Sequence, residues 1–176
     1  MKILGIGNAI VDVICKVDDS FIEQNNLTKS TMKLFFDENE FKSLLLNLKI
    51  EKTVSGGSVA NSIVGLSQLG NQVGFIGKVS DDEFGRRYEE GLKKENVEYF
   101  YSKKKEELPT GTCLILVTPD SERTMCTFLG TAGKINEHDI NSDAIKKVKL
   151  YFWRVTCGMK ESQKKHLIKP SIMQIE

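Results

Sequence analysis

The chain has 176 residues, of which 40% are hydrophobic and 28% charged, and its 25 Lys+Arg nearly balance its 24 Asp+Glu. This composition is typical of a globular protein and excludes intrinsic disorder, which requires low hydrophobicity together with a large net charge. The net charge of +1 provides no basic excess for nucleic acid or a membrane surface, and no apolar run has the roughly 18 residues of a membrane-spanning helix.

The hydrophobic pattern predicts an alternation of strands and helices along the chain. Strands are predicted, in chain order, over 2–7, 10–17, 31–36, 72–79, 97–102, 111–118 and 123–129, with another starting at 149. Helices are predicted over 38–48, 58–69, 81–96 and 136–147, a turn over 53–57, and a polar loop or helix over 18–29.

Two arrangements of strands are interleaved in this order. The units 2–7, 58–69, 72–79 and 81–96 predict a parallel sheet covered by helices. The strands without intervening helices predict a separate, mostly antiparallel sheet, made from 10–17, 31–36, 97–102, 111–118 and 123–129. We therefore expect an α/β core with a β-sheet flap, and ligands at the carboxyl ends of the parallel strands.

The first strand ends in a segment with candidate binding residues. The segment 5–12 begins like a dinucleotide-binding loop, but Ile10 stands where a third glycine belongs and no helix is predicted to follow. A carboxylate paired with an amide, here Asp12 and Asn8, is suited to hold vicinal hydroxyls. The alternative is that Asn8 caps a turn and that Asp12 is a solvated loop residue.

A second candidate segment runs from a glycine turn into a helix. Gly56 and Gly57 let the backbone approach a ligand closely, and the helix that begins near Ser58 offers free N–H donors. Asn61 lies one helical turn further, so its side chain can return to the same pocket. The alternative is a glycine turn followed by an ordinary Ser N-cap.

The cysteines and histidines predict neither a metal site nor a nucleophilic triad. The four cysteines (Cys15, Cys113, Cys126 and Cys157) form no CxxC pair, and the two histidines are far apart in polar segments. We expect reduced thiols in a cytoplasmic protein and no metal ligand in this chain.

Five motifs in order resemble the ribokinase-like (PfkB) carbohydrate kinases, in their adenosine-kinase-like branch. The resemblance covers residues 1 to about 151 and comprises Gly7-Asn8 with Asp12, then 56–62, 77–85, 109–112 and 122–130. It implies a Rossmann-like three-layer α/β/α core, incomplete here, with a β-sheet lid from about 10–36 and 97–130. Departures are Ser30 and Ser80, where the family usually has Gly, and Cys126, where this branch often has Asn.

The resemblance also implies an activity. The full-length family transfers a phosphoryl group from ATP, with Mg²⁺, to a hydroxyl of a small-molecule sugar or nucleoside. Adenosine is the leading acceptor, and another furanose or a hexose is the alternative. The residues implied to bind the acceptor are Asn8, Asp12, Gly56, Gly57, Ser58 and Asn61.

The catalytic parts of the family are missing from this sequence. The family's catalytic Asp lies in a Gly-Ala-Gly-Asp motif of the C-terminal half, where the ATP pocket is also built, and this chain contains no such motif. We therefore expect no catalytic residue and no ATP site here, and a chain that is inactive alone.

The segment 152–176 does not continue the family pattern. With permitted codons, a shifted reading frame from Phe152 encodes Leu-Glu-Gly-Tyr-Leu-Trp-Asp, which this branch leads us to expect there. We therefore predict an out-of-frame tail, with a divergent C-terminus as the alternative, and sequencing of the encoding DNA decides between them.

Two rival interpretations remain at this point. The chain is either a non-catalytic sugar-binding protein or one that forms a homodimer through its lid sheet, because lid sheets of this family can pair between subunits. It is also expected to be unstable if its parallel sheet lacks later strands.

Overall fold

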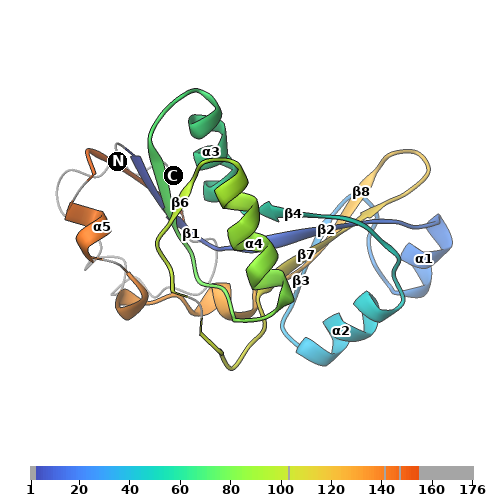
Figure 1. Cartoon of the computed structure of the whole chain (residues 1–176). Coiled ribbons are helices and arrows are strands. Elements are labelled where there is room, and N and C mark those ends of the chain that lie inside the picture. The colour runs from blue at the N-terminus through green and yellow to red at the C-terminus, as the bar shows by residue number, and fades with distance from the viewer. Residues whose placement is uncertain (1–2, 103, 141, 147, 155–176) are drawn as a thin grey trace.

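A computed structural model describes residues 3–102, 104–140, 142–146 and 148–154 (Figure 1). The chain forms two sheets with different connections. The four-stranded central sheet has the strand order β6–β5–β1–β9, with β6 at Glu98–Tyr99, β5 at Val73–Ile76, β1 at Ile3–Gly7 and β9 at Leu150–Arg154. All of its strand pairs are parallel, as the strand–helix–strand pattern predicts.

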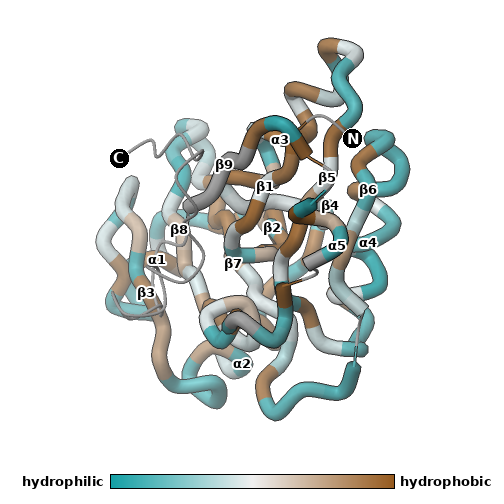
Figure 2. The backbone as a smooth tube through the Cα atoms, turned by 90° about the vertical axis from the view of Figure 1, so that its left-hand side faces the viewer, coloured by the Kyte–Doolittle hydropathy of each residue, from teal (hydrophilic) through white to brown (hydrophobic). Residues whose placement is uncertain are grey.

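Helices cover both faces of the central sheet. On one face lie α3 (Ser58–Gln68) and α4 (Glu83–Lys94), whose buried side chains pack against Phe75 of β5. On the other face, a smaller core joins Leu4, Ile6 and Ile76 to Ala144 of α5 (Ser142–Lys146). The predicted three-layer α/β/α arrangement is therefore confirmed, and hydrophobic residues concentrate along its central strand β1 (Figure 2).

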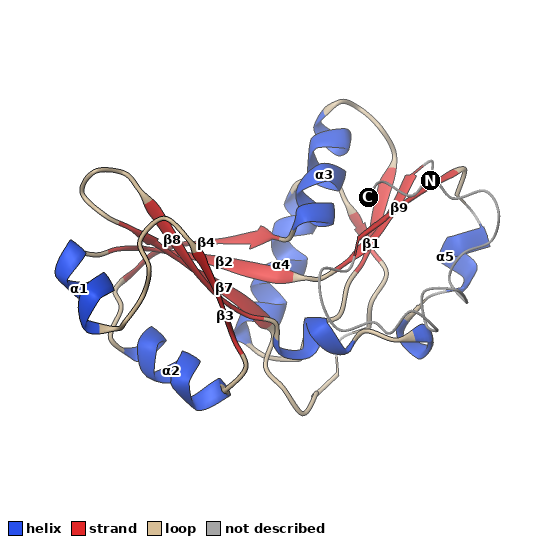
Figure 3. Ribbon diagram, turned by 180° about the vertical axis from the view of Figure 1, so that it is seen from behind, coloured by secondary structure: helices blue, strands red, loops and turns tan. Residues whose placement is uncertain are grey.

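The second sheet forms the lid. Its five strands have the order β3–β8–β7–β2–β4, with β3 at Met32–Phe35, β8 at Arg123–Phe128, β7 at Gly111–Val117, β2 at Ile10–Lys16 and β4 at Ile50–Gly56. Figure 3 shows α1 (Asp19–Gln24) and α2 (Glu38–Leu46) on one side of this sheet. The ring of Phe41 in α2 stacks on Phe128, with 5.5 Å between ring centroids, so α2 is anchored to the lid.

The structure corrects three details of the predicted lid. The segment predicted as a turn at 53–57 is mostly part of β4, a strand at the edge of the sheet. It pairs with β2, and the periodicity of the sequence did not reveal this pairing. The segment 97–102 contributes β6 to the central sheet, because it pairs with β5. The lid is not mostly antiparallel, since β2–β7 and β3–β8 are parallel pairs while β2–β4 and β7–β8 are antiparallel.

Several other elements are shorter than predicted. The segment predicted as a helix over 136–147 contains a 3-10 turn, Glu137–Asp139, and the short α5. A further 3-10 helix, η1 (Gly130–Lys134), follows β8 and packs on the lid near Ile10 and Cys113.

Ser30, where the family pattern has Gly, adopts φ 61°, so the position does require left-handed backbone. Within the described ranges, no helix has the length and apolar character needed to cross a bilayer.

Candidate functional site

The junction between β1 and β2 contains a buried amide without a hydrogen-bond partner. Asn8 is 6% exposed, and neither its Oδ1 nor its Nδ2 bonds to any described group. A buried polar side chain left in this state is uncommon and costs free energy of folding. It is therefore the strongest local sign of a site that a polar ligand completes.

The carboxylate of Asp12 lies on β2 beside Gly56 at the end of β4. The two strands pair antiparallel, with Ile10 opposite Gly56 and Asp12 opposite Val54. A Cβ at position 56 would lie 2.2 Å from Asp12 Oδ2, so only glycine leaves room for the carboxylate. Burial raises the pKa of the Asp12 carboxyl from 3.8 to about 6.

Gly57 completes the turn between β4 and α3. Its φ is 103°, and a Cβ there would lie 2.4 Å from the backbone oxygen of Asn8. Gly57 is also the N-cap of α3, and no side chain caps this helix. The free N–H groups of the first turn of α3 therefore remain available beside Asn8 and Asp12.

Replacing Gly57 with Ala is expected to lower the free energy of unfolding by roughly 2–3 kcal/mol, because the left-handed backbone and the Asn8 oxygen both oppose a Cβ. Gly65 in α3 is the matched control, since nothing lies within 4 Å of a Cβ there. Gly65→Ala should stabilise the chain by roughly 0.5–1 kcal/mol through helix propensity. Urea denaturation measures both; equal effects of the two substitutions would contradict the close approach at Gly57.

The raised pKa of Asp12 gives the stability a defined pH dependence. Because the folded state holds the proton up to about pH 6 and the unfolded state releases it near 3.8, the contribution of Asp12 to stability falls between these values. Asp12→Asn should therefore become increasingly stable relative to the wild type as pH rises from about 4 to 6, with a plateau above. Urea denaturation at several pH values measures the difference; a difference that does not change with pH would contradict the raised pKa.

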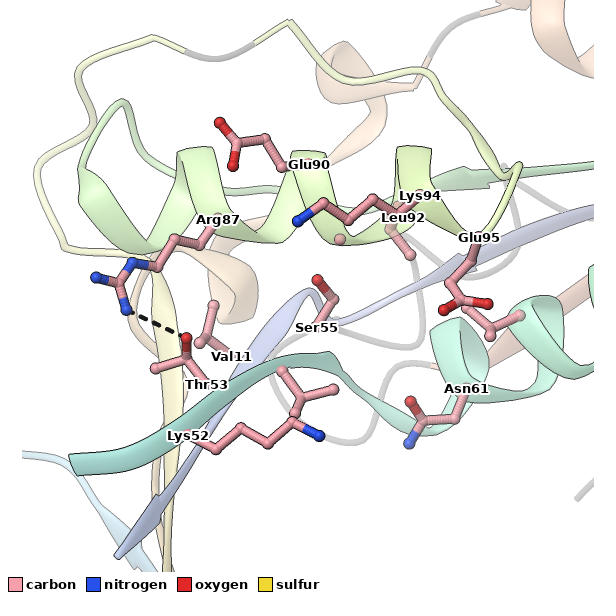
Figure 4. A pocket seen from close by; sticks show the side chains of 13 residues that line it. Val11, Lys52, Thr53, Ser55, Asn61, Arg87, Glu90, Leu92, Lys94 and Glu95 are labelled. Carbon is pink, nitrogen blue, oxygen red and sulfur yellow. Dashed lines mark hydrogen bonds between the residues drawn. The ribbon is translucent and has the colours of Figure 1, made fainter.

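The remaining two predicted residues lie further along α3. Ser58 is the first residue of the helix and is exposed, and Asn61 is exposed one turn later. Asn61 lines a pocket of about 560 Å³ between α3, α4 and β4, together with Lys52, Thr53, Arg87, Lys94 and Glu95 (Figure 4). None of the other predicted acceptor-binding residues lines this pocket, so Asn61 lies at a neighbouring cavity. The structure brings together four of the others, Asn8, Asp12, Gly56 and Gly57.

The strand register reveals neighbours of Asp12 that the motifs did not indicate. Cross-strand partners share a face of a sheet, so Asp12 lies in one row with Val54, Cys113, Thr127 and Leu34. The next row on this face contains Lys52, Ile14, Ile115, Met125 and Met32. We call these two rows the open lid face, because α1 and α2 cover the opposite face. The two-residue periodicity of each strand indicates which of its residues share a face. Which strands lie side by side on that face is known only from the structure.

These features define what the site can do chemically. The Asp12 carboxylate can accept hydrogen bonds from two hydroxyls, the Asn8 amide can donate and accept, and the start of α3 can donate. The apolar rows beside Asp12 can pack against a ring. Among the described residues, no group of three or more His, Cys, Asp or Glu side chains is arranged to hold a metal ion. The donors and acceptors of this site can therefore bind a molecule that carries hydroxyls.

Comparison with known proteins is consistent with this geometry. Residues 2–168 match the model of the pfkB family carbohydrate kinases. A 5-dehydro-2-deoxygluconokinase from Mesomycoplasma hyopneumoniae is 31% identical over 117 residues, and a probable fructokinase-7 from Arabidopsis thaliana is 32% identical over 104 residues. The crystal structure of adenosine kinase from Sinorhizobium meliloti superposes with a TM-score of 0.76 at 32% identity.

The similarity covers most of this chain but only part of each relative. The alignments include 65% of this chain and 35% of the deoxygluconokinase, and 58% and 30% for the fructokinase. The structural match covers 86% of this chain and 46% of the adenosine kinase. The chain thus spans about half the length of that solved structure and about a third of the curated relatives.

Proposed function

The chain belongs to the pfkB family of carbohydrate kinases, and from that premise we propose that it carries the acceptor-binding half of a sugar or nucleoside kinase. The buried Asn8 amide without a partner is the observation that carries this proposal. In the proposed complex Asp12 and Asn8 bind vicinal hydroxyls, while Gly56 and Gly57 let the acceptor approach the backbone. Ser58 would complete the pocket from the start of α3, whereas Asn61 lines the neighbouring cavity.

Adenosine is the acceptor that we propose first. The open lid face places Ile14 and Val54 beside Asp12, and an apolar surface next to a hydroxyl-binding carboxylate suits a base attached to a ribose. The similarity to an adenosine kinase at 32% identity supports the same choice. The sugar alternatives follow from relatives that are named a fructokinase and a 5-dehydro-2-deoxygluconokinase.

The kinases of this family use ATP, typically with Mg²⁺. The sequence of this chain has no Gly-Ala-Gly-Asp motif, which carries the catalytic Asp in the family that the chain resembles. We therefore propose that the chain alone binds the acceptor without transferring a phosphoryl group. ADP release by this 176-residue chain in the presence of ATP and adenosine would contradict that proposal.

The origin of the last residues stays a prediction. Strand β9 extends to Arg154, and the match to the family model extends to residue 168. Both therefore continue past the predicted boundary between residues 151 and 152. Residues beyond 154 lie outside the described part of the chain. A cytoplasmic location also stays a prediction.

Isothermal titration of the chain with adenosine, ribose and fructose tests the proposed function. We expect adenosine to bind more tightly than ribose, because only adenosine also reaches the apolar rows. Preference for fructose would support a sugar kinase instead, and no heat with any of the three would contradict acceptor binding.

A second candidate function is homodimerisation through the lid. Met32 is 64% exposed and Met125 37% exposed at the outer part of the open lid face, where a second copy could cover them. Sedimentation equilibrium tests this possibility: a dimer that Met125→Lys dissociates would support it, and a wild-type monomer at high concentration would exclude it.

A further inference from the structure

A tyrosine outside the predicted site contacts the glycine turn. Tyr88 lies on α4, its side chain is fully buried, and its hydroxyl donates a hydrogen bond of 3.2 Å to the carbonyl oxygen of Gly56. A phenylalanine would fill the same aromatic cluster with Phe75 and Tyr99. The hydroxyl therefore adds one feature to the packing, namely a fixed partner for the Gly56 carbonyl.

The backbone of α4 is itself held against β4. The Ser55 hydroxyl donates to the carbonyl oxygen of Tyr88 at 2.9 Å, and a Cβ at Gly91 would lie 2.0 Å from the Ser55 oxygen. One turn earlier, Arg87 donates to the Thr53 hydroxyl at 3.2 Å (Figure 4). Helix α4 thus contacts β4 at Arg87, Tyr88 and Gly91, and these contacts hold the backbone of Tyr88 next to the strand.

The edge position of β4 explains why such contacts matter. Within the described part of the sheet, β4 pairs only with β2, so its other side has no ladder of backbone hydrogen bonds. Gly56 is the last residue of this strand and Gly57 begins the turn, and neither has a side chain that could hold the backbone by packing. The hydrogen bonds between α4 and Thr53, Ser55 and Gly56 therefore hold β4 where no neighbouring strand does.

We propose that Tyr88 is a positioning residue for the acceptor site: its hydroxyl fixes the Gly56 carbonyl, and thereby the Gly56–Gly57 turn that closes against Asp12 and Asn8. The effect on acceptor binding rests on the proposed function, whereas the effect on the turn does not. Tyr88 would not touch the acceptor. It would hold the backbone at the distance that leaves room for the Asp12 carboxylate.

Tyr99 provides a matched control. It belongs to the same aromatic cluster, with 6.0 Å between its ring centroid and that of Tyr88, and its hydroxyl donates to the Gly77 carbonyl at 2.6 Å. Tyr99→Phe therefore removes the same chemical group from the same core. Its lost partner lies after β5 and not at the glycine turn.

Amide hydrogen exchange and adenosine titration of Tyr88→Phe and Tyr99→Phe test the proposal. Losing one buried hydrogen bond is expected to speed exchange over residues 54–58 roughly fivefold in Tyr88→Phe and to leave it unchanged in Tyr99→Phe. Adenosine should bind roughly fivefold more weakly to Tyr88→Phe only. Both variants should lose similar global stability in urea, so a general loss of stability would not imitate this pattern.

The outcomes separate the two proposals. Equal exchange over 54–58 in the two variants would overturn the positioning role, as would faster exchange with unchanged adenosine affinity. If the wild type binds none of the acceptors tested, the proposed function fails, and faster exchange in Tyr88→Phe alone would still support control of the turn.

Discussion

Replacing Lys78 with Met is expected to lower the free energy of unfolding by about 3–5 kcal/mol. Lys78 follows β5, and its Nζ lies 3.1 Å from Asp139 Oδ2 and 3.3 Å from Glu106 Oε2. The side chains of Lys78 and Asp139 are 7% and 3% exposed, so methionine would leave a buried carboxylate without its main counter-charge. Lys104 lies 3.9 Å from Asp139 but is largely exposed and compensates little.

Urea denaturation measures this effect against a surface pair. Arg86 lies 3.2 Å from Asp81 with both side chains more than half exposed, so Arg86→Ala should change stability by less than about 0.5 kcal/mol. Adding Asp139→Asn to Lys78→Met should recover part of the loss, because the uncompensated charge is removed. Similar losses for Lys78→Met and Arg86→Ala would show that the buried cluster does not hold the segments after β6 and β8.

Replacing Asp12 with Asn is expected to weaken adenosine binding roughly 100-fold. Hydrogen bonds to a charged group contribute about 1.5–3 kcal/mol each, and the carboxylate is proposed to accept two, of which the amide oxygen of Asn can still accept one. The same substitution removes a carboxylate whose pKa burial raises to about 6, so the variant should be more stable than the wild type at pH 7. Opposite effects on binding and stability would separate loss of a ligand contact from loss of the fold.

Asp18→Asn is the control for this experiment. Asp18 lies just beyond β2, is exposed, and its side chain makes no capping hydrogen bond to α1. It removes the same charge and should leave adenosine binding within about twofold of the wild type. Weakening by both substitutions would indicate a general electrostatic effect, and unchanged binding by Asp12→Asn would contradict the proposed role of Asp12.

The sequence predicted those parts of the fold that depend on local pattern. Helix α4 lies within the helix predicted over 81–96, and β2 lies within the strand predicted over 10–17. Asn8, Asp12 and the two glycines could be proposed as one site because they follow strand ends and match one family. The structure does bring these four residues together.

The parts that were missed depend on contacts between distant segments. Residues 50–56 were not predicted as a strand because Glu51, Lys52 and Ser55 give no clear alternation, and β2 supplies the ladder. The charges of Lys78 and Asp139 become partners only when segments 61 residues apart meet. Likewise, Tyr88 was not among the residues predicted for the site, and its hydroxyl contacts Gly56, which lies 32 residues away in the sequence.

The most direct test of the acceptor site is an NMR titration of the Asp12 carboxyl with and without saturating adenosine. We expect a pKa of about 6 in the free chain, and a clearly lower value with adenosine, because ribose hydroxyls that donate to the carboxylate favour its charged form. An Asp12 pKa that adenosine leaves unchanged, or raises, would contradict the assignment of Asp12 as the residue that binds the acceptor hydroxyls.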